Sequence, residues 1–309
     1  MEILLILLLA IIIDLALGEL PRVIHPVVGM GKVASFLAKG GIGYSPLAQL
    51  LYGLGIVLVT MGVFVAPAYF MLFYLKGLNF AAHVIVGAVL LKATFSLREL
   101  RQAALRVKRL LLEDKLAEAR TSLRSLVSRD TADLDKSQLV SATVESVAEN
   151  SCDSFVAPLF YFLLFGVPGA IAYRVINTFD AMIGYHGKWE HLGNFAARLD
   201  DVANFIPARI TALIIVLAAW ICRKDMSGAW QIMLRDHRKT QSPNAGWTMS
   251  AIAGALGVQL EKAGHYKLGD NHYPLSLNTI DASWQMIMTV ALIWSLVSIL
   301  TEVVYIVTT

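Results

Sequence analysis

The sequence predicts an all-α fold, a polytopic integral membrane helical bundle with about five to six membrane segments and a cytoplasmic amphipathic helical insert. The first reason is composition: 57% of the 309 residues are hydrophobic, 16% are charged, and the mean hydropathy is +0.62. Few soluble proteins have such a composition. The second reason is that apolar stretches recur at about 20 residues, the length that a helix needs to cross the hydrocarbon core. We expect one integral membrane domain over residues 1–309.

Six stretches fit a membrane span: 2–17, 47–75, 80–97, 155–173, 205–222 and 284–307. The first lacks the basic start and small-residue cleavage site of a signal peptide, so we interpret it as a retained helix. The fourth contains Pro158, Gly166 and Pro168, which indicate a discontinuous or re-entrant element. Whether this fourth stretch crosses fully is left open by the sequence.

Charge predicts the sidedness of the loops. Loops 18–46, 98–154 and 223–283 hold 20 of the 26 Lys and Arg residues. The positive-inside rule therefore places these loops in the cytoplasm and the protein in the cell membrane. The net charge is only +3, with no basic stripe, so nucleic acid is not an expected partner. Two cysteines, Cys152 and Cys222, are too few for a disulfide framework, and we interpret both as small apolar residues.

The insert at about 98–154 has a helical pattern. Apolar residues recur at 4-3-4-3 spacing and predict one long amphipathic helix ending near Ser128; they are Leu112, Leu116, Ala119, Leu123 and Leu126. A second helix is expected after an N-cap at Asp133 or Asp135, running to about Asn150. A polar loop is expected at about 223–283.

A first polar cluster lies at the end of the insert. Glu145, Glu149 and Asp153 are four residues apart, so on a helix they form one acidic stripe. Such a stripe is suited to Mg²⁺, which prefers oxygen ligands. Valines occupy the opposite face, however, and the commoner interpretation of this pattern is the solvated side of an amphipathic helix.

A second cluster follows the fourth stretch. Arg174, Asn177 and Asp180 form a polar edge on an otherwise apolar helix, ahead of Tyr185 and His186. This edge suits a binding site or hydrogen bonds between membrane helices. A lone histidine such as His186 is more often structural or exposed than catalytic.

A third cluster contains Arg198, Asp200, Asp201, Asn204 and Arg209. Adjacent carboxylates repel each other unless a cation lies between them, and either a metal or a local arginine meets that need. Arg209 lies inside an apolar run, so it must snorkel, pair with an acid or bind an anionic ligand.

A fourth cluster combines the basic run 235–239 with a turn at Ser242-Pro243-Asn244 and a helix expected from about Trp247 to Leu260. Turn amides and a helix N-terminus favour anions, which indicates a phosphate cradle. A basic patch on anionic lipid is the alternative. The chain has no Walker A glycine loop, so an ATP site would not be a P-loop.

Longer strings carry a family resemblance. They are Val144–Asn150, Ala157–Phe160, Pro168–Arg174, Asn177–Asp180, Ala197–Asp201, Pro207–Arg209 and Ser242–Trp247. In this order, over nearly the whole chain, they resemble the adenosylcobinamide-phosphate synthase family. The chain departs from the family near its N-terminus, where Gly18-Glu19-Leu20-Pro21 stands in place of Gly-Asp-Pro-Pro. The core acids and arginines of the family pattern are present.

The resemblance implies ATP-dependent amide formation between adenosylcobyric acid and aminopropanol or aminopropanol O-phosphate, giving adenosylcobinamide or its phosphate. ATP would convert the corrinoid carboxylate into an acyl phosphate, which the amine then attacks. The implied cofactors are ATP and Mg²⁺, with the corrinoid as substrate. The implied partners are the lipid bilayer and other membrane enzymes of cobalamin assembly.

The resemblance also implies roles for individual residues. Catalytic roles are expected for Glu149, Asn150, Asp180, Asp200 and Asp201. Metal ligands are expected at Glu145, Glu149, Asp153 and Asp201. Substrate or phosphate contacts are expected at Arg129, Asp130, Arg174, Asn177, Arg198, Asn204, Arg209, Arg235, Lys239, Ser242 and Asn244.

Two other functions fit the same composition. A transporter would line its substrate path with a broken helix and intramembrane charges, and would move substrate without cleaving ATP. A non-catalytic membrane sensor on the same scaffold would have no chemistry.

Overall fold

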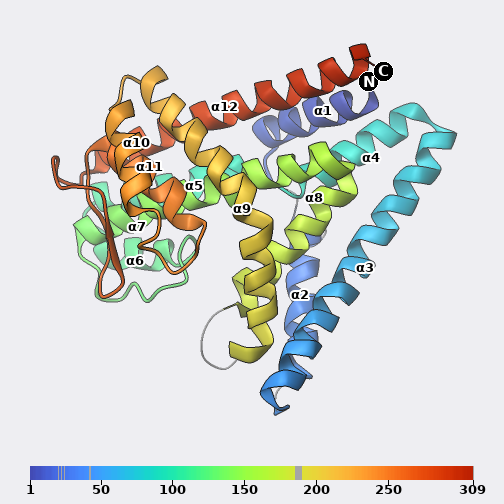
Figure 1. Cartoon of the computed structure of the whole chain (residues 1–309), viewed down its shortest axis with the longest axis horizontal. Helices are drawn as coiled ribbons and strands as arrows, with labels where there is room; N and C mark the ends of the chain where they lie inside the picture. The colour runs from blue at the N-terminus through green and yellow to red at the C-terminus, as the bar shows by residue number, and fades with distance from the viewer. Residues whose placement is uncertain (20, 22, 24, 42, 185–189, 309) are drawn as a thin grey trace. The chain divides into compact units, whose positions relative to one another are not determined.

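The structure is a computed structural model that describes residues 1–19, 21, 23, 25–41, 43–184 and 190–308. Helices dominate these residues, and the strands among them form one short hairpin (Figure 1). Five helical stretches are long and apolar enough to cross a membrane; they are Pro46–Leu78, Phe80–Leu112, Lys136–Ile183, His191–Ile221 and Leu277–Thr308. The protein is therefore an all-α polytopic membrane protein, as predicted.

The chain forms two compact units, each assembled from segments far apart in sequence. Unit 1 comprises residues 1–96, 157–204 and 298–309, and unit 2 comprises residues 97–156 and 205–297. The boundary falls inside two long helices, α9 (Glu190–Ile221) and α12 (Leu277–Thr308). The prediction of one integral domain stays a prediction.

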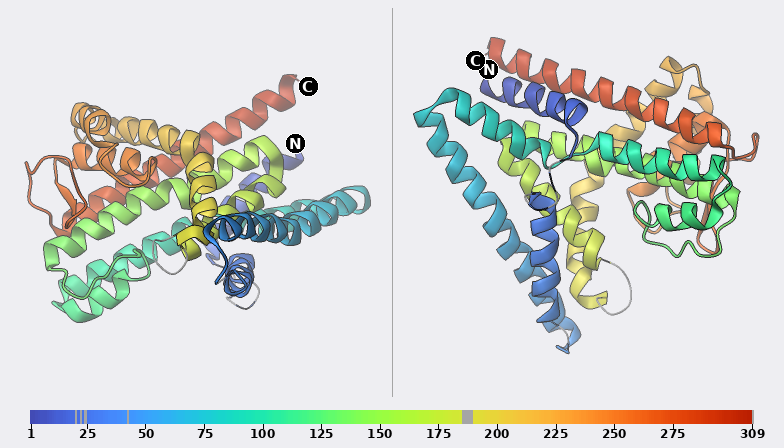
Figure 2. Two further views of the ribbon diagram at one scale, coloured as in Figure 1. Left: turned by 60° about the horizontal axis from the view of Figure 1, so that its bottom comes forward. Right: turned by 180° about the vertical axis from the view of Figure 1, so that it is seen from behind.

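Unit 1 is built around apolar helices. Its complete helices are α1 (Glu2–Ala16), α2 (Pro26–Lys39), α3 (Pro46–Leu78), α4 (Phe80–Lys92) and α8 (Ala157–Ile183). The predicted span 2–17 is α1, a helix of 15 residues. It packs against α4, and a Cβ on Gly87 of α4 would lie 2.8 Å from Ile6 (Figure 2). Helix α2 was not predicted, because the sequence analysis treated residues 18–46 as a loop.

Helix α8 is a hairpin and not a straight span. Gly166 has φ 66° and ψ −161°, a backbone conformation that breaks the helix and that glycine adopts at little cost. The rings of Tyr161 and Tyr173 stack at 5.3 Å, although twelve residues of straight helix would separate them by about 18 Å. A Cβ on Gly169 would lie 2.6 Å from the carbonyl oxygen of Tyr161, so the two arms touch. The prediction of a broken or re-entrant element at 155–173 is confirmed.

A buried ion network ties α1 to α4. Lys92 is fully buried, and its Nζ lies 3.1 Å from Asp14 and 2.7 Å from Glu19. Glu19 also accepts a hydrogen bond from His25, which caps the N-terminus of α2 through Val27 N–H. Burial alone would raise the pKa of Glu19, but the hydrogen bonds from His25 and Lys92 lower it to about 2. The network therefore joins α1, α4 and the start of α2.

Unit 2 holds the insert and the polar loop. Its elements are α5 (Leu97–Leu112), α6 (Leu116–Leu123), α7 (Lys136–Ser151), the π-helical turn η1 (Cys152–Val156), α10 (Met226–Asp236), α11 (Ala245–Leu256) and the strands β1 (Leu260–Lys262) and β2 (Tyr266–Leu268). Helices α10 and α11 pack so closely that a Cβ on Gly254 would overlap the carbonyl oxygen of Gly228. Helix α11 was predicted from Trp247 to Leu260, but it starts earlier and ends where the hairpin begins.

The long helix predicted to end near Ser128 is two helices. Asp114 has φ 54°, a left-handed conformation that ends α5 and allows the chain to turn into α6. Leu112, predicted on the buried face, is 61% exposed, whereas Ala119 and Leu123 are buried. The periodic pattern was correct on each side of the break, but a single left-handed residue cannot be recognised from periodicity.

Helix α7 begins as predicted at Asp135. The Asp135 side chain accepts from Gln138 N–H while the Gln138 side chain accepts from Asp135 N–H, which is a complete capping box. Residues 139–148 are buried on every face of α7, however, including Glu145, which is only 4% exposed. The interpretation of Glu145 as part of a solvated face is therefore wrong, because β1, α5 and α11 pack around this helix.

Replacement of Lys92 by methionine tests the ion network. Lys92→Met leaves the buried carboxylate of Asp14 without its cation and removes one of the partners of Glu19, which should lower the free energy of unfolding by about 3–5 kcal/mol. Lys76→Met is the matched control, since Lys76 pairs with Glu2 at the surface and should contribute less than about 1 kcal/mol. Denaturant titration in detergent measures both; equal small losses would contradict a stabilising network.

Candidate functional site

The Asp200 cluster in unit 1 joins the second arm of α8 to the first half of α9. It comprises Tyr173, Arg174, Asn177, Asp200 and Asn204. The Asp200 carboxylate accepts from Asn204 Nδ2 at 2.9 Å and from Asn177 Nδ2 at 3.4 Å. Each amide is in turn an acceptor, from Tyr173 Oη at 2.9 Å and from Arg174 Nη1 at 3.1 Å. The predicted residues of the second and third polar clusters therefore meet around one buried carboxylate.

Close packing positions this cluster. A Cβ on Gly193 would overlap the carbonyl oxygen of Ile183, and a Cβ on Gly53 would overlap that of Leu192. These glycines let the start of α9 lie directly against the end of α8 and against α3. Tyr173 is 1% exposed, and its ring is held by the stack on Tyr161. The amide and carboxylate groups consequently have little freedom to rotate.

Other predicted residues of unit 1 lie near the cluster in sequence. Asp180 is half-buried, and a Cβ on Gly184 would overlap its carboxylate. Asp201 is half-buried, and Arg198 is exposed. Tyr185 and His186 lie outside the described residues.

The Glu145 cluster in unit 2 is formed by Arg129, Ser141, Glu145 and Tyr266. Ser141 Oγ donates to Glu145 Oε1 at 2.7 Å, and Tyr266 Oη donates to Oε2 at 2.8 Å. Arg129 lies 3.2 Å from the same Oε2. Burial raises the pKa of Tyr266, and the negative charge of Glu145 raises it further. Both oxygens of Glu145 are thus engaged: Oε1 within α7, and Oε2 in joining α7 to the β-hairpin and the Arg129 segment.

The predicted acidic stripe is interrupted where the α-helix α7 gives way to the π-helical turn η1. Asp153 lies in η1, a π-helical turn, so the three predicted acids do not follow one straight α-helical stripe. Asn150 Nδ2 donates to the carbonyl oxygen of Ser146, and Asn150 Oδ1 accepts from Ser154. Glu149 and Asp153 are half-buried, and Asp130 is exposed. π-Helical turns occur often at functional sites, which makes this segment a second candidate region.

The Arg209 cluster in unit 2 holds a guanidinium between aromatic rings. Arg209 Cζ lies 3.6 Å from the ring centroid of Phe205 and 4.9 Å from that of Trp247. Its Nη1 donates to Asn244 Oδ1 at 3.0 Å, and the His237 ring packs on Trp247 at 4.0 Å. Arg209 and Asn244, predicted as ligand contacts, are therefore brought together by α9 and the turn before α11.

The basic run before that turn is already paired with acids. Asp236 is fully buried and accepts from Arg235 Nε at 2.8 Å, Lys239 Nζ at 2.6 Å and Gly269 N–H at 2.8 Å. Arg235 also forms a two-pronged pair with Asp270. These partners raise the pKa of Arg235. A phosphate held by Arg235 or Lys239 would have to compete with Asp236 and Asp270.

The predicted phosphate turn is held by its own side chains. Ser242 Oγ accepts from Asn244 N–H at 3.2 Å and from Ala245 N–H at 3.4 Å. Thr240 Oγ1 donates to the carbonyl oxygen of Ser242. The first amides of α11 are thus partly satisfied within the turn, and an anion there would be bound by replacing the Ser242 hydroxyl.

The acids do not form a preassembled metal centre among the described residues, where no three Asp, Glu, His or Cys side chains lie together as ligands. Mg²⁺ in phosphoryl-transfer sites often has one or two protein carboxylates, with phosphates and water completing its shell. The metal assignments of Glu145, Glu149, Asp153 and Asp201 stay predictions. The contacts of Glu145 favour a structural role for this residue.

Several partners were missed by the sequence analysis: Tyr173, Ser141, Tyr266, Asp236 and Trp247 were not named as site residues. Tyrosine and tryptophan are common on apolar helices, so nothing local marks them. Only their contacts show that they donate to, or stack on, the predicted polar residues.

Known proteins resemble this chain over most of its length. The family described as CobD/Cbib protein matches residues 7–297. The cobalamin biosynthesis protein CobD of Dehalococcoides mccartyi (strain CBDB1) is 55% identical over 303 residues, 97% of each chain. The probable cobalamin biosynthesis protein CobD of Methanocaldococcus jannaschii is 38% identical over 298 residues, 94% of this chain and 97% of the relative. No solved structure matches the chain.

Acid titration tests the buried pairing of Asp236. Burial would raise the pKa of Asp236, but Arg235, Lys239 and Gly269 N–H lower it from 3.8 to about 2. The carboxylate therefore stabilises the fold above about pH 4, and this stabilisation is lost as the pH falls through 2. Asp236→Asn should be less stable than the unaltered protein at pH 7, and the difference should shrink between about pH 4 and pH 2.

The matched control is Asp281→Asn, which removes an exposed partner of Lys108. Stability is measured as the midpoint of urea unfolding, and the midpoint of Asp281→Asn should differ little from that of the unaltered protein at every pH. A stability difference for Asp236→Asn that stays constant down to pH 2 would refute the pairing.

Proposed function

The chain belongs to the CobD/Cbib family and takes part in cobalamin biosynthesis as an enzyme, and on this premise we propose that it joins adenosylcobyric acid to an amine in an ATP-dependent amide synthesis. The amine is aminopropanol or aminopropanol O-phosphate. The observation that carries this proposal is the Asp200 cluster, a buried carboxylate between two oriented amides. Four of its five residues, Tyr173, Arg174, Asn177 and Asp200, belong to the strings that resemble the adenosylcobinamide-phosphate synthases.

The reaction has two steps, which are activation of the corrinoid carboxylate by ATP and attack by the amine. A corrinoid carboxylate cannot be attacked directly by an amine, because the leaving group would be oxide. Transfer of the terminal phosphoryl group of ATP to the carboxylate forms an acyl phosphate and releases ADP. The amine then attacks the acyl carbon, the C–O bond to phosphate breaks, and the amide and inorganic phosphate leave.

Attack by the amine requires a base. The amine is an ammonium ion at neutral pH and must lose a proton before or during its attack on the acyl phosphate. We assign the removal of this proton to the carboxylate of Asp200, whose oxygens are held in place by Asn177 and Asn204. Arg174 lies at the edge of the same cluster, where a guanidinium suits a phosphate or carboxylate group.

Activation of the carboxylate requires cations near the phosphates of ATP. Arg209 lies close to the rings of Phe205 and Trp247, and its guanidinium suits a bidentate contact with an oxyanion. Mg²⁺ would supply charge neutralisation for the phosphoryl groups when bound. Glu149, Asp153 and Asp201 are the acids that we propose for it. Arg198, Arg235, Lys239, Ser242 and Asn244 stay proposed contacts for substrate.

The reaction is tested with the purified full chain in lipid nanodiscs. We expect adenosylcobyric acid, ATP, Mg²⁺ and one of the two amines to give a corrinoid whose mass has increased by one amide linkage. Omission of ATP should abolish the increase. Lack of product with either amine, combined with movement of corrinoid across sealed vesicles without ATP cleavage, would favour the transporter function instead.

Asp200→Asn tests the base within the same assay. The substitution keeps the size of the side chain but removes the proton acceptor, so the rate of amide formation should fall by about 10²-fold or more. Asp281→Asn is the control, because it removes a carboxylate on an exposed surface. Both variants should elute as the unaltered protein does in gel filtration. A normal rate for Asp200→Asn would exclude the assignment.

A further inference from the structure

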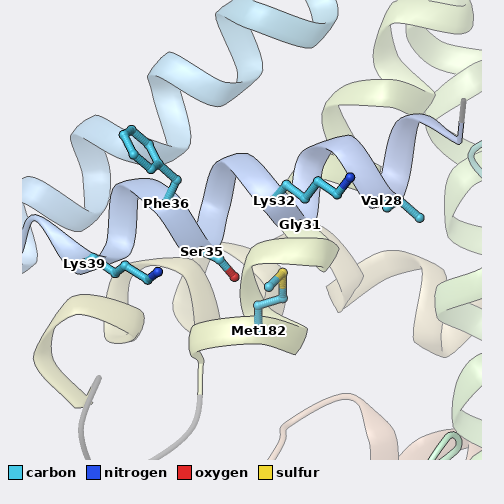
Figure 3. A pocket seen from close by; sticks show the side chains of 7 residues that line it. All are labelled: Val28, Gly31, Lys32, Ser35, Phe36, Lys39 and Met182. Atoms are coloured by element: carbon cyan, nitrogen blue, oxygen red, sulfur yellow. The ribbon is translucent and has the colours of Figure 1, made fainter. Parts of the chain in front are cut away.

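A pocket of about 440 Å³ lies on unit 1, and none of its lining residues is predicted for the amide reaction. It is lined by one face of α2 and by Met182 of α8 (Figure 3). Gly31 allows this approach, since a Cβ there would lie 3.0 Å from the Met182 sulfur. The polar groups of the pocket are Lys32, Ser35 and Lys39, and its apolar surface comes from α2 and Met182.

The contacts between α2 and α3 indicate how deep in the membrane this pocket lies. Tyr52 Oη of α3 donates to the Leu37 carbonyl oxygen, and a Cβ on Gly29 would lie 3.4 Å from the Phe64 ring. The two helices therefore run in opposite directions, joined by residues 40–45. Lys32 lies level with about Val59 and Thr60 of α3.

Helix α3 has no charged residue from Pro46 to Leu75. A hydrocarbon core needs about 20 of these residues, so wherever it falls along the stretch it includes residues 56–65. Lys32 consequently lies at the depth of the hydrocarbon core, and Ser35 lies near its edge. Lys39, level with Tyr52, lies closer to the membrane surface.

A lysine at this depth needs a compensating group. Lys32 and Lys39 are exposed, and among the described residues neither has a carboxylate within 4 Å. An ammonium group facing lipid tails is strongly disfavoured, so an intramembrane lysine snorkels towards the membrane surface or faces water, an acid or a bound anion. Lys32 has no acid beside it among the described residues, and the groove next to it is suited to water or an anionic ligand.

We propose that this α2 groove is an open anion-binding site at membrane depth that binds a phosphate ester with a small apolar body. Lys32 and Lys39 are on one side of α2, with Ser35 between them in sequence, and supply the phosphate contacts. Met182 and Val28 contact the apolar body. The proposal does not depend on the amide reaction, because none of its residues belongs to the clusters described above.

Thiol labelling tests whether the α2 groove holds water. Ser35→Cys and Leu58→Cys are compared in nanodiscs, each in a chain whose Cys152 and Cys222 are alanine. Both positions are exposed on the protein, and the pairing of α2 with α3 places Ser35 within about one helical turn of the level of Leu58. A membrane-impermeant maleimide should label Ser35→Cys and leave Leu58→Cys unlabelled. Equal lack of labelling at both positions would show that lipid tails fill the groove and would overturn the proposal.

Ligand binding is measured with phenyl phosphate in phosphatidylcholine nanodiscs. Lys32→Gln and Lys39→Gln should each weaken binding by about tenfold, which corresponds to 1.4 kcal/mol, whereas Lys224→Gln, on an exposed position outside the groove, should not. Phosphatidylglycerol that competes in a Lys32-dependent way would identify a lipid headgroup as the source of the phosphate ester. No competition would identify a soluble ester. Identical binding by all variants, or no binding, would refute the site.

Discussion

Polar side chains on apolar helices must find their partners inside the protein, and this constraint determines which helix faces meet in this structure. Lys92 is fully buried between Asp14 and Glu19, so α1 can pack on α4 in one register only. Asp200 is held between Asn177 and Asn204, which joins α9 to the second arm of α8. Glu145 binds α7 to the β-hairpin through Tyr266. Loss of any partner would leave a charge in a medium of low dielectric constant.

The hairpin of α8 makes the Asp200 cluster possible. A straight helix over 157–183 would carry Tyr173, Arg174 and Asn177 far from Tyr161, whereas the break at Gly166 turns them back along the first arm. Broken helices at membrane depth are tolerated where protein covers the freed backbone groups, and the arms cover each other here.

Much of the fold was predictable because it depends on local chemistry. Long uncharged runs predicted the apolar helices, the acid at 135 predicted the start of α7, and Pro158, Gly166 and Pro168 predicted a broken element. The turn at Asp114 was missed because one left-handed residue does not disturb an apolar repeat. Helix α2 was missed because, at 14 residues, it is shorter than a membrane span, and the segment that contains it was interpreted as a loop.

The candidate site was predictable only in part. Arg174, Asn177, Asp200 and Asn204 were named from their residue types, and the structure brings these four together. The partners that orient them were not named, since Tyr173 has an ordinary apolar context in sequence. Glu145 was assigned to a metal or to solvent because the residues that cover it, Ser141 apart, are remote; Tyr266 is 121 residues away.

The Asp200 cluster depends most directly on the reversal of the chain at Gly166. Tyr161→Cys and Tyr173→Cys can be introduced together in a chain whose native cysteines are alanine, and treated with a bifunctional thiol reagent much shorter than the ~18 Å that twelve residues of straight helix span. We expect an intramolecular cross-link, identified by the mass of the joined peptides. The pair Leu47→Cys and Leu58→Cys, on one face of the straight part of α3, should not be joined. Failure to join positions 161 and 173 while both thiols react singly would show a straight span and would contradict the assembled site.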